Sequence, residues 1–150
     1  MKTIAITALC ATLLGSAALA GNDMDDATLQ DAIARFTAAG PQGAQLRLMD
    51  VTDFEWDTVR TYHGVTSIEL YRFHLGADFR LSDESVQQLM DDSAVLIFLR
   101  GDEIVEEVVI NPPVWFLGKH LDGSAREPDD AILTVISEDP GPYSAVQFVK

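Results

Sequence analysis

Cysteine is almost absent from this chain of 150 residues, and its one copy, Cys10, lies in an apolar stretch near the start. The residues after position 20 therefore have no thiol with which to form a disulfide, a redox pair or a thiolate nucleophile. A fold built from them must be held together by packing. A chain of about 130 residues is long enough to bury one sizeable core without such links.

Basic residues are also scarce, because 10 Lys and Arg stand against 24 Asp and Glu, for a net charge of −14. This balance excludes nucleic acid and anionic lipid as expected partners, since both would be repelled. A strongly acidic surface suits a basic protein partner, divalent cations, or simply high solubility. A basic protein is the partner that we predict if the acidity serves recognition.

The motifs of common catalytic and metal-binding sites are missing. No serine lies in a Gly-x-Ser-x-Gly turn, no glycine-rich phosphate loop is present, and there is neither a His-Glu-x-x-His helix nor a calcium loop. The three histidines, His63, His74 and His120, are too scattered to form a local ligand pair. The sequence therefore predicts no cofactor, no metal site and no catalytic residue.

No apolar run reaches the length of about 20 residues that a membrane-spanning helix needs. The N-terminal run instead has the parts of a secretory signal peptide: a positive charge at Lys2, apolar residues 4–14, and the cleavage signal Ala18-Leu19-Ala20. We predict that residues 1–20 are removed on export to the periplasm or the extracellular medium. Residues 21–150 would remain as one domain that does not insert into a membrane.

The strongest structural signal lies at residues 94–110, where two apolar runs flank a Gly101-Asp102 dipeptide that is typical of a two-residue hairpin turn. The first arm is apolar without interruption and should be a central strand, whereas Glu106 and Glu107 in the second arm indicate a strand near an edge. The turn would set three opposite pairs: Arg100 with Glu103, Phe98 with Val105, and Ile97 with Glu106.

Helical patterns precede this hairpin. Residues 26–39 have the apolar spacing of an amphipathic helix, which Asp25 or Asp26 would cap and Gly40-Pro41 would end. A second helix should open at a capping box of Thr66 and Glu69 and close at Gly76. Its expected apolar face is Ile68, Tyr71, Phe73 and Leu75. A short turn of helix is expected after Ser82.

Strands are expected at residues 45–51, 131–136 and 144–149, with Leu46 and Leu48 pointing inward and a turn at Pro140-Gly141 before the last strand. Residues 111–128 look like a long irregular connection in which Trp115 and its neighbours fold back over the core. Together these patterns predict a single small α+β domain with a mainly antiparallel sheet, on which an N-terminal helix and one or two further short helices pack.

The most individual stretch runs from Phe54 to His63, and it needs a bend near Asp57-Thr58 if its apolar side chains are all to face inward. Its pattern Phe54-x-Trp56-Asp57-x-Val59, followed by Tyr62 and a short helix ending in Leu75-Gly76, resembles a group of small exported bacterial proteins of unassigned function. In those proteins the run follows a strand, and a later hairpin resembles residues 94–110. The resemblance implies no catalytic residues.

We predict a non-enzymatic exported binding protein, such as an inhibitor, an immunity protein or an envelope accessory factor. Aromatic and arginine side chains dominate protein interfaces. The candidate contact residues are therefore Trp56, Asp57, Arg60, Tyr62 and Trp115.

Two alternatives stay open. A small hydrolase or metal-dependent enzyme would use Asp53, Glu55, Asp57 and His63, because alternate carboxylates on an ideal strand line one face about 7 Å apart. A structural component of the envelope is the other alternative, which the sequence does not separate from a binding protein.

Overall fold

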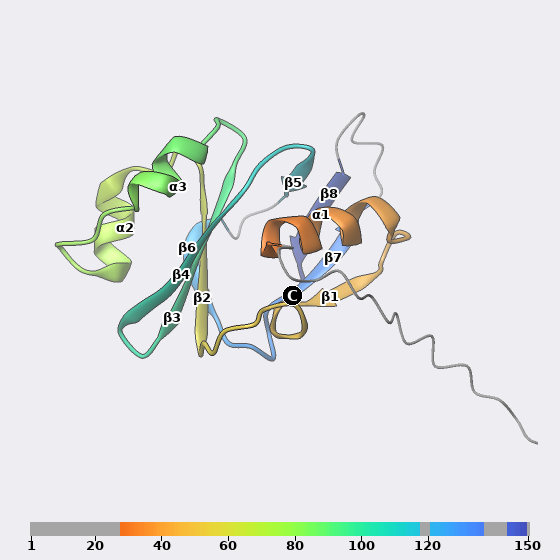
Figure 1. Ribbon diagram of the computed structural model, residues 1–150, viewed down its shortest axis with the longest axis horizontal. Coiled ribbons are helices and arrows are strands. Elements are labelled where there is room, and N and C mark those ends of the chain that lie inside the picture. Colours follow the sequence, from red (N-terminus) through yellow and green to blue (C-terminus); the bar gives the residue numbers. More distant parts are fainter. Residues whose placement is uncertain (1–27, 118–120, 137–143, 150) are drawn as a thin grey trace, which may run out of the picture.

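The computed structural model describes residues 28–117, 121–136 and 144–149. Its elements divide into three α-helices, a 3₁₀ turn and eight strands (Figure 1). In chain order they are α1 (Leu29–Ala39), β1 (Gln45–Arg47), η1 (Leu48–Asp50), β2 (Thr58–His63), α2 (Ile68–Leu75), α3 (Asp83–Gln88), β3 (Ala94–Arg100), β4 (Glu103–Ile110), β5 (Val114–Phe116), β6 (Asp122–Arg126), β7 (Ile132–Ile136) and β8 (Ser144–Phe148).

The strands form two sheets of four. One, which we call the hairpin sheet, has the order β4-β3-β2-β6, and the other, the C-terminal sheet, has the order β1-β7-β8-β5. Every pair is antiparallel except β5 with β8, which is parallel. The predicted α+β class and the mainly antiparallel pairing are confirmed, and the division into two sheets is a feature that the sequence patterns did not resolve.

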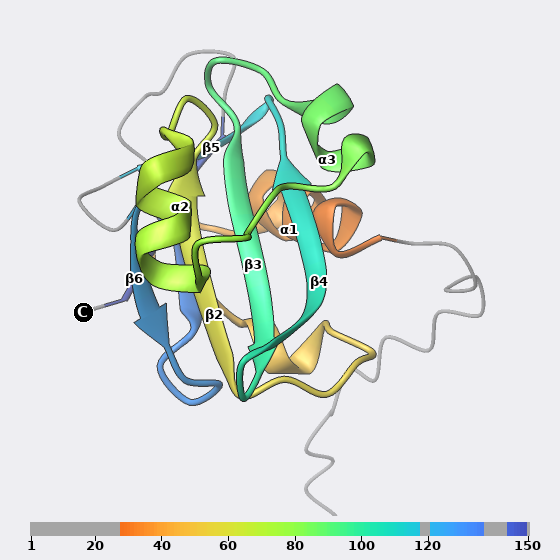
Figure 2. The same ribbon diagram turned by 90° about the vertical axis from the view of Figure 1, so that its left-hand side faces the viewer.

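The hairpin sheet stands between two layers (Figures 1 and 2). On one face lie α2 and α3, and on the other lie α1 and the C-terminal sheet. The main core fills the space on the α1 side and includes Ile33, Leu96, Phe98 and Leu133. A second core lies under α2 and includes Tyr62, Tyr71 and Ile97. The hairpin sheet is therefore buried on both faces, which leaves its edges as the exposed parts of its backbone.

The central hairpin forms around the predicted turn. Gly101 has φ +61°, as a primed turn requires, and Arg100 lies opposite Glu103. All six residues of β3 from Ala94 to Leu99 are buried, so that β3 is the central strand that its apolar run predicts. β4 lies at the edge, as its two glutamates indicate.

The predicted pairing beyond the first residues of this hairpin is wrong by one residue. The register shifts between Phe98 and Leu99, so that Phe98 lies opposite Glu106 and Ile97 opposite Glu107. The extra residue in β4 brings Val108 opposite Leu96, where the predicted register would have placed Glu107. On the main-core face the bulge thus moves the glutamate from opposite Leu96 to opposite Phe98, one pair closer to the hairpin turn.

The helices are confirmed, with corrections at their ends. Thr28 is the N-cap of α1 and forms a capping box with Asp31, so that the helix begins after Asp25 and Asp26, which lie outside the described residues. Ser67 occupies the N-cap of α2 and makes no side-chain cap bond, so that the predicted Thr66 capping box is wrong. Gly76 closes α2 as expected, with φ +105°.

The predicted apolar face of α2 is wrong at Phe73, whose side chain is 82% exposed, while Tyr71 is buried. Positions two residues apart on a helix point about 200° apart, so that both rings cannot face the same core. The predicted contacts of Ile68 and Leu75 with the second core are confirmed, and Leu70 packs there as well.

Three further differences concern strands. β1 ends at Arg47, and Leu48 is buried from a 3₁₀ turn instead of from a strand. Residues 54–57 form no strand, because β2 begins only at Thr58, after the predicted bend. Within 111–128 the expected irregular connection contains both β5 and β6. In β6, Asp-Gly-Ser-Ala-Arg has neither the alternation nor the β-branched side chains that mark a strand.

Two predictions concern residues outside the described part of the chain. The signal peptide at residues 1–20 and the Pro140-Gly141 turn both lie there and stay predictions. Within the described part, no helix is long and apolar enough to cross a membrane.

Candidate binding surface

β4 forms one margin of the hairpin sheet (Figure 2). It pairs with β3 on one side, and no strand among the described residues pairs with its other side. The backbone N–H and C=O groups that alternate along that outer side therefore have no strand partner there, as in any edge strand. With eight residues, β4 offers a long edge.

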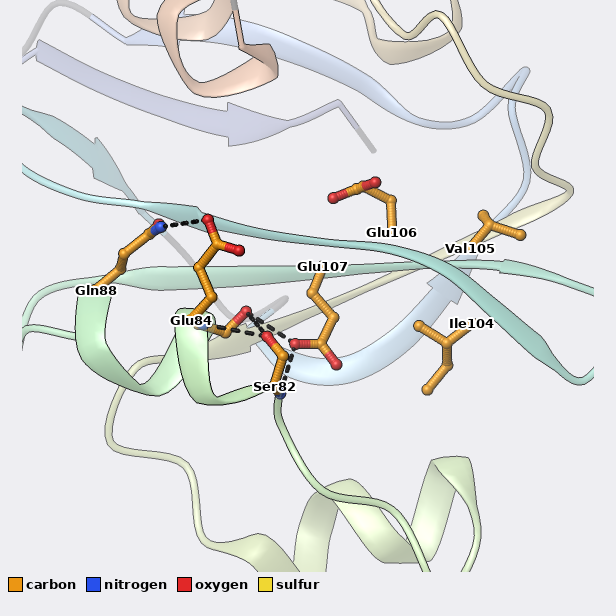
Figure 3. A pocket seen from close by; sticks show the side chains of 8 residues that line it. Ser82, Glu84, Gln88, Ile104, Val105, Glu106 and Glu107 are labelled. Carbon is orange, nitrogen blue, oxygen red and sulfur yellow. Dashed lines mark hydrogen bonds between the residues drawn. The ribbon is translucent and has the colours of Figure 1, made fainter.

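Two neighbouring glutamates project from opposite faces of β4 (Figure 3). Glu106 lies opposite Phe98 of the main core, and Glu107 lies opposite Ile97 of the second core. Consecutive residues of a strand alternate in this way. Each face beside the edge therefore receives one carboxylate.

The α3 groove, of about 280 Å³, lies between α3 and β4 (Figure 3). There the carboxylate of Glu107 accepts two hydrogen bonds, from the backbone N–H of Ser82 at 2.9 Å and from the hydroxyl of Ser85 at 2.8 Å. These bonds hold the first turn of α3 against β4. The groove is lined by Ser82, Glu84, Ser85, Gln88, Ile104, Val105, Glu106 and Glu107.

The α1 groove, of about 420 Å³, borders the start of α1 and the segment 51–54. It shares four lining residues with the α3 groove: Glu84, Gln88, Glu106 and Glu107. The two grooves therefore meet along the edge of β4. Asp53 adds a further carboxylate to the α1 groove.

The carboxylates around the α1 groove are crowded. Partial desolvation by packed neighbours is the main cause that raises the pKa of Glu106. A hydrogen bond from the backbone N–H of Glu107 opposes it, and the negative charges of Asp53, Glu107 and Glu84 each add a smaller increase. None of these four carboxylates has a lysine or arginine within ion-pair distance among the described residues. No cation in the described part of the chain therefore compensates the negative charge of these four carboxylates.

The Trp56 groove, of about 440 Å³, continues from the α1 groove, because Thr52 and Phe54 line both. Its lining is largely apolar and includes Met49 and Pro128. The Trp56 ring packs edge-on against Phe98 with centroids 5.0 Å apart, and its Nε1 donates to the Thr52 hydroxyl at 2.9 Å. The indole is thus held in a fixed position beside the groove.

Charged groups also border the Trp56 groove. The carboxylate of Asp57 accepts a hydrogen bond from the N–H of Gly101 at 2.7 Å, and Glu55 lies 3.8 Å from the Arg100 guanidinium. We call the outer side of β4 and its three connected grooves the acidic edge surface. Its carboxylates are Asp53, Glu55, Asp57, Glu84, Glu106 and Glu107, and Arg100 is the only basic side chain among its lining residues.

The five predicted contact residues do not share one surface. Trp56 and Asp57 line the Trp56 groove. Arg60 and Tyr62 lie on the α2 face of β2, where Arg60 donates to the carbonyl oxygen of Gly123 at 2.6 Å. Trp115 is 36% exposed on β5, in the other sheet.

Tyr62 is not available for contact in this fold, because its side chain is fully buried. Its hydroxyl lies 3.3 Å from Nδ1 of His74. Burial raises the pKa of Tyr62 to about 12, with a smaller contribution from Asp122 and an opposing one from Arg60.

The residues of the enzymatic alternative are not brought together. Asp53 lines the α1 groove, whereas Glu55 and Asp57 line the Trp56 groove, because this segment is not the strand that the alternation assumes. His63 ends β2, about 16 Å along the strand from Thr58. Within the described ranges, no group of three or more His, Cys, Asp or Glu is placed to hold a metal ion.

A fourth groove, of about 470 Å³, lies beside β6 and is bordered by Arg126. The guanidinium of Arg126 lies 4.5 Å from the ring centroid of Phe148 and donates to the carbonyl oxygens of Asp130 and Val149, both at 3.4 Å. Arg126 therefore links the hairpin sheet to the C-terminal sheet on this side.

No family model matches the chain, and neither a curated protein nor a solved structure matches it. The resemblance of the Phe54–Val59 run to small exported bacterial proteins stays a prediction. In the sequence, Glu106 and Glu107 indicate a strand near an edge, and no pattern singles out Glu84 as a site residue. Glu84, Glu106 and Glu107 lie close together because α3 packs on β4, and no local sequence pattern indicates that packing.

Proposed function

We propose that this chain is a small exported binding protein that acts by contact with a basic protein, as an inhibitor, an immunity protein or an envelope accessory factor does. The observation that supports this best is the gathering of uncompensated carboxylates along an exposed strand edge. The acidic edge surface is the proposed contact region.

The charge of the surface favours a basic partner. Complementary charge steers encounter and rejects partners of like sign. Carboxylates that raise one another's pKa, as at Glu106, cost stability in the free protein. A cationic side chain placed among them would remove that cost, so that the arrangement is more favourable in a complex than alone.

The Trp56 groove supplies the apolar part of the proposed contact. Protein interfaces combine a desolvated aromatic centre with a charged rim. Trp56 is fixed by Phe98 and Thr52, and Met49 is 43% exposed beside it. The charged groups of Glu55, Asp57 and Arg100 surround these side chains.

The experiment is a pull-down from an envelope extract, followed by affinity measurement with each purified partner. The test variant is the pair Glu84→Gln and Glu106→Gln. The matched control, Asp78→Asn with Asp92→Asn, removes the same charge from exposed residues that line none of the three grooves.

We expect the control to bind as the wild type does and the test variant to bind about tenfold more weakly, with all complexes weakening between about 50 and 500 mM salt. Equal losses in both variants would indicate general charge attraction. Unchanged binding by the test variant would place the contact elsewhere. Either result would overturn the proposal.

A further inference from the structure

We propose that the partner contributes an extended basic segment that pairs with the outer side of β4 and becomes a fifth strand of the hairpin sheet. This inference rests on the proposed function and specifies how the acidic edge surface recognises its partner. An extended peptide that joins a sheet edge gains main-chain hydrogen bonds, and pockets for its alternate side chains give specificity.

Strand addition requires a long exposed strand at the edge of a sheet. Among the edge strands of the two described sheets, only β4 is of that length. The outermost strands of the C-terminal sheet, β1 and β5, have three residues each. β6, at the far edge of the hairpin sheet, has five residues and an irregular register with β2. β4 has eight residues, of which those from Glu103 to Val108 are exposed or half-buried.

The grooves on the two sides of β4 fit the alternation of an added strand. Side chains of such a strand would point by turns toward the α1 groove and the α3 groove. In the α1 groove they would meet the uncompensated carboxylates of Asp53 and Glu106. In the α3 groove they would meet Ile104, which packs against the second core, and Glu107, which is already bonded to Ser82 and Ser85.

This placement predicts the chemistry of the partner segment. Lysine or arginine would occupy the positions that face the α1 groove, and β-branched residues would occupy those that face the α3 groove. The β4 strand of a second copy of this chain does not have this basic pattern. Pairing two β4 edges would bring glutamates close to glutamates across the new pair of strands, which is unfavourable.

The probe is a synthetic ten-residue peptide in which lysine alternates with valine and threonine. Its affinity for the full mature chain is measured by calorimetry, and amide hydrogen exchange is followed residue by residue by NMR. Two further peptides carry backbone N-methyl groups, one at all odd positions and the other at all even positions. A strand added to one edge donates hydrogen bonds from only one of these sets.

We expect bound peptide to slow the exchange of the outward-facing amides of β4 about tenfold or more while leaving those of β6 unchanged. One N-methylated peptide should bind as the parent does, and the other about tenfold more weakly. The Glu84→Gln and Glu106→Gln pair should weaken parent binding, whereas the Asp78→Asn and Asp92→Asn pair should not.

The failures of the two proposals are distinguishable. If the peptide binds with the expected charge sensitivity, but β4 amides stay unprotected and both N-methylated peptides bind equally, strand addition is wrong and the binding function stands. Absence of peptide binding would also overturn strand addition, and the partner would then be sought by pull-down alone. Protection of β4 by self-association without peptide would identify a second copy as the occupant instead.

Discussion

The two edges of the hairpin sheet differ in how they meet solvent. At the β6 edge, Arg60 donates to the carbonyl oxygen of Gly123, and Arg126 reaches across to Phe148 in the other sheet. At the β4 edge, Glu107 bonds to the first turn of α3, but the outer backbone side has no strand partner among the described residues, and carboxylates line both faces. One edge is closed by side chains, whereas the other is left open and charged.

This difference bears on how an exposed edge is protected. Proteins prevent unwanted pairing with short strands, bulges and charged side chains. β6 is short and pairs with β2 in an irregular register, and the lack of a side chain at Gly123 allows α2 to lie close to it. β4 has a bulge near its start and relies mainly on charge, which repels copies of the same chain and leaves a basic strand free to pair.

Substitution of Gly123 by alanine should have the largest effect. Gly123 has φ +83°, and a Cβ at this position would collide with the His74 ring and approach Cε1 of Tyr62 to 2.5 Å. We expect a loss of about 3 to 4 kcal/mol in the free energy of unfolding, measured by urea denaturation, because the strained backbone adds to a steric clash.

Gly43 provides the matched control for that change. Its φ is +81°, and a Cβ there would meet nothing within 4 Å. Gly43→Ala should therefore show only the backbone cost of about 1 to 2 kcal/mol. Equal losses at the two glycines would show that contact with α2 does not close the β6 edge.

Alkaline pH should cause the second-largest loss of folding stability, through Tyr62 beside β6. Because burial raises the pKa of Tyr62 to about 12 from the usual 10, the folded state holds a proton that the unfolded state has released between these values. The contribution of Tyr62 to stability is therefore intact below pH 10 and falls by roughly 2 to 3 kcal/mol as the pH rises to about 12, in addition to the loss from Tyr71, whose pKa burial also raises. Tyr62→Phe removes this contribution, and parallel pH curves for variant and wild type over this range would contradict the assignment.

Loss of the Arg60 side-chain hydrogen bond should have a smaller effect. Arg60→Met keeps the aliphatic stem and removes the donor to Gly123, which should lower the free energy of unfolding by about 2 kcal/mol. Hydrogen exchange should quicken in β6 and not in β4. Arg80→Met, at an exposed arginine between α2 and α3, should stay within about 0.5 kcal/mol of the wild type.

Glu106→Gln on the open edge should have the smallest effect and the opposite sign. Since partial desolvation, with smaller additions from neighbouring negative charges, raises the pKa of Glu106, its ionised form disfavours the fold at neutral pH, and neutralising it should stabilise the protein by less than about 0.5 kcal/mol. The gain should vanish at acidic pH, where the wild-type carboxyl is already protonated. Thermal melts at the two pH values check this, and a loss of stability at neutral pH would contradict it.

Local signals in the sequence predicted the parts of the fold that local chemistry decides. Gly101-Asp102 fixed the hairpin turn because few other residues adopt its backbone conformation, and Gly76 ended α2 for the same reason. The unbroken apolar run of β3 predicted its central place, since only a strand covered on both faces tolerates it.

Features that depend on distant partners were not predictable in this way. The bulge in β4 follows from which of its side chains must face the main core, and β6 forms because Arg60 and α2 hold a segment of low strand propensity in place. For the candidate site, the predicted aromatic at Trp56 lies in the groove. Arg60 and Tyr62 instead face α2, because the bend before Thr58 sets the parity of β2.

The fixed position of Trp56 has a practical consequence. The chain has two tryptophans, and only Trp56 lies in the acidic edge surface, while Trp115 belongs to the other sheet. A Trp115→Phe protein would therefore emit from a single indole next to the proposed contact. Its fluorescence would report occupancy of that groove directly, without any dye or label.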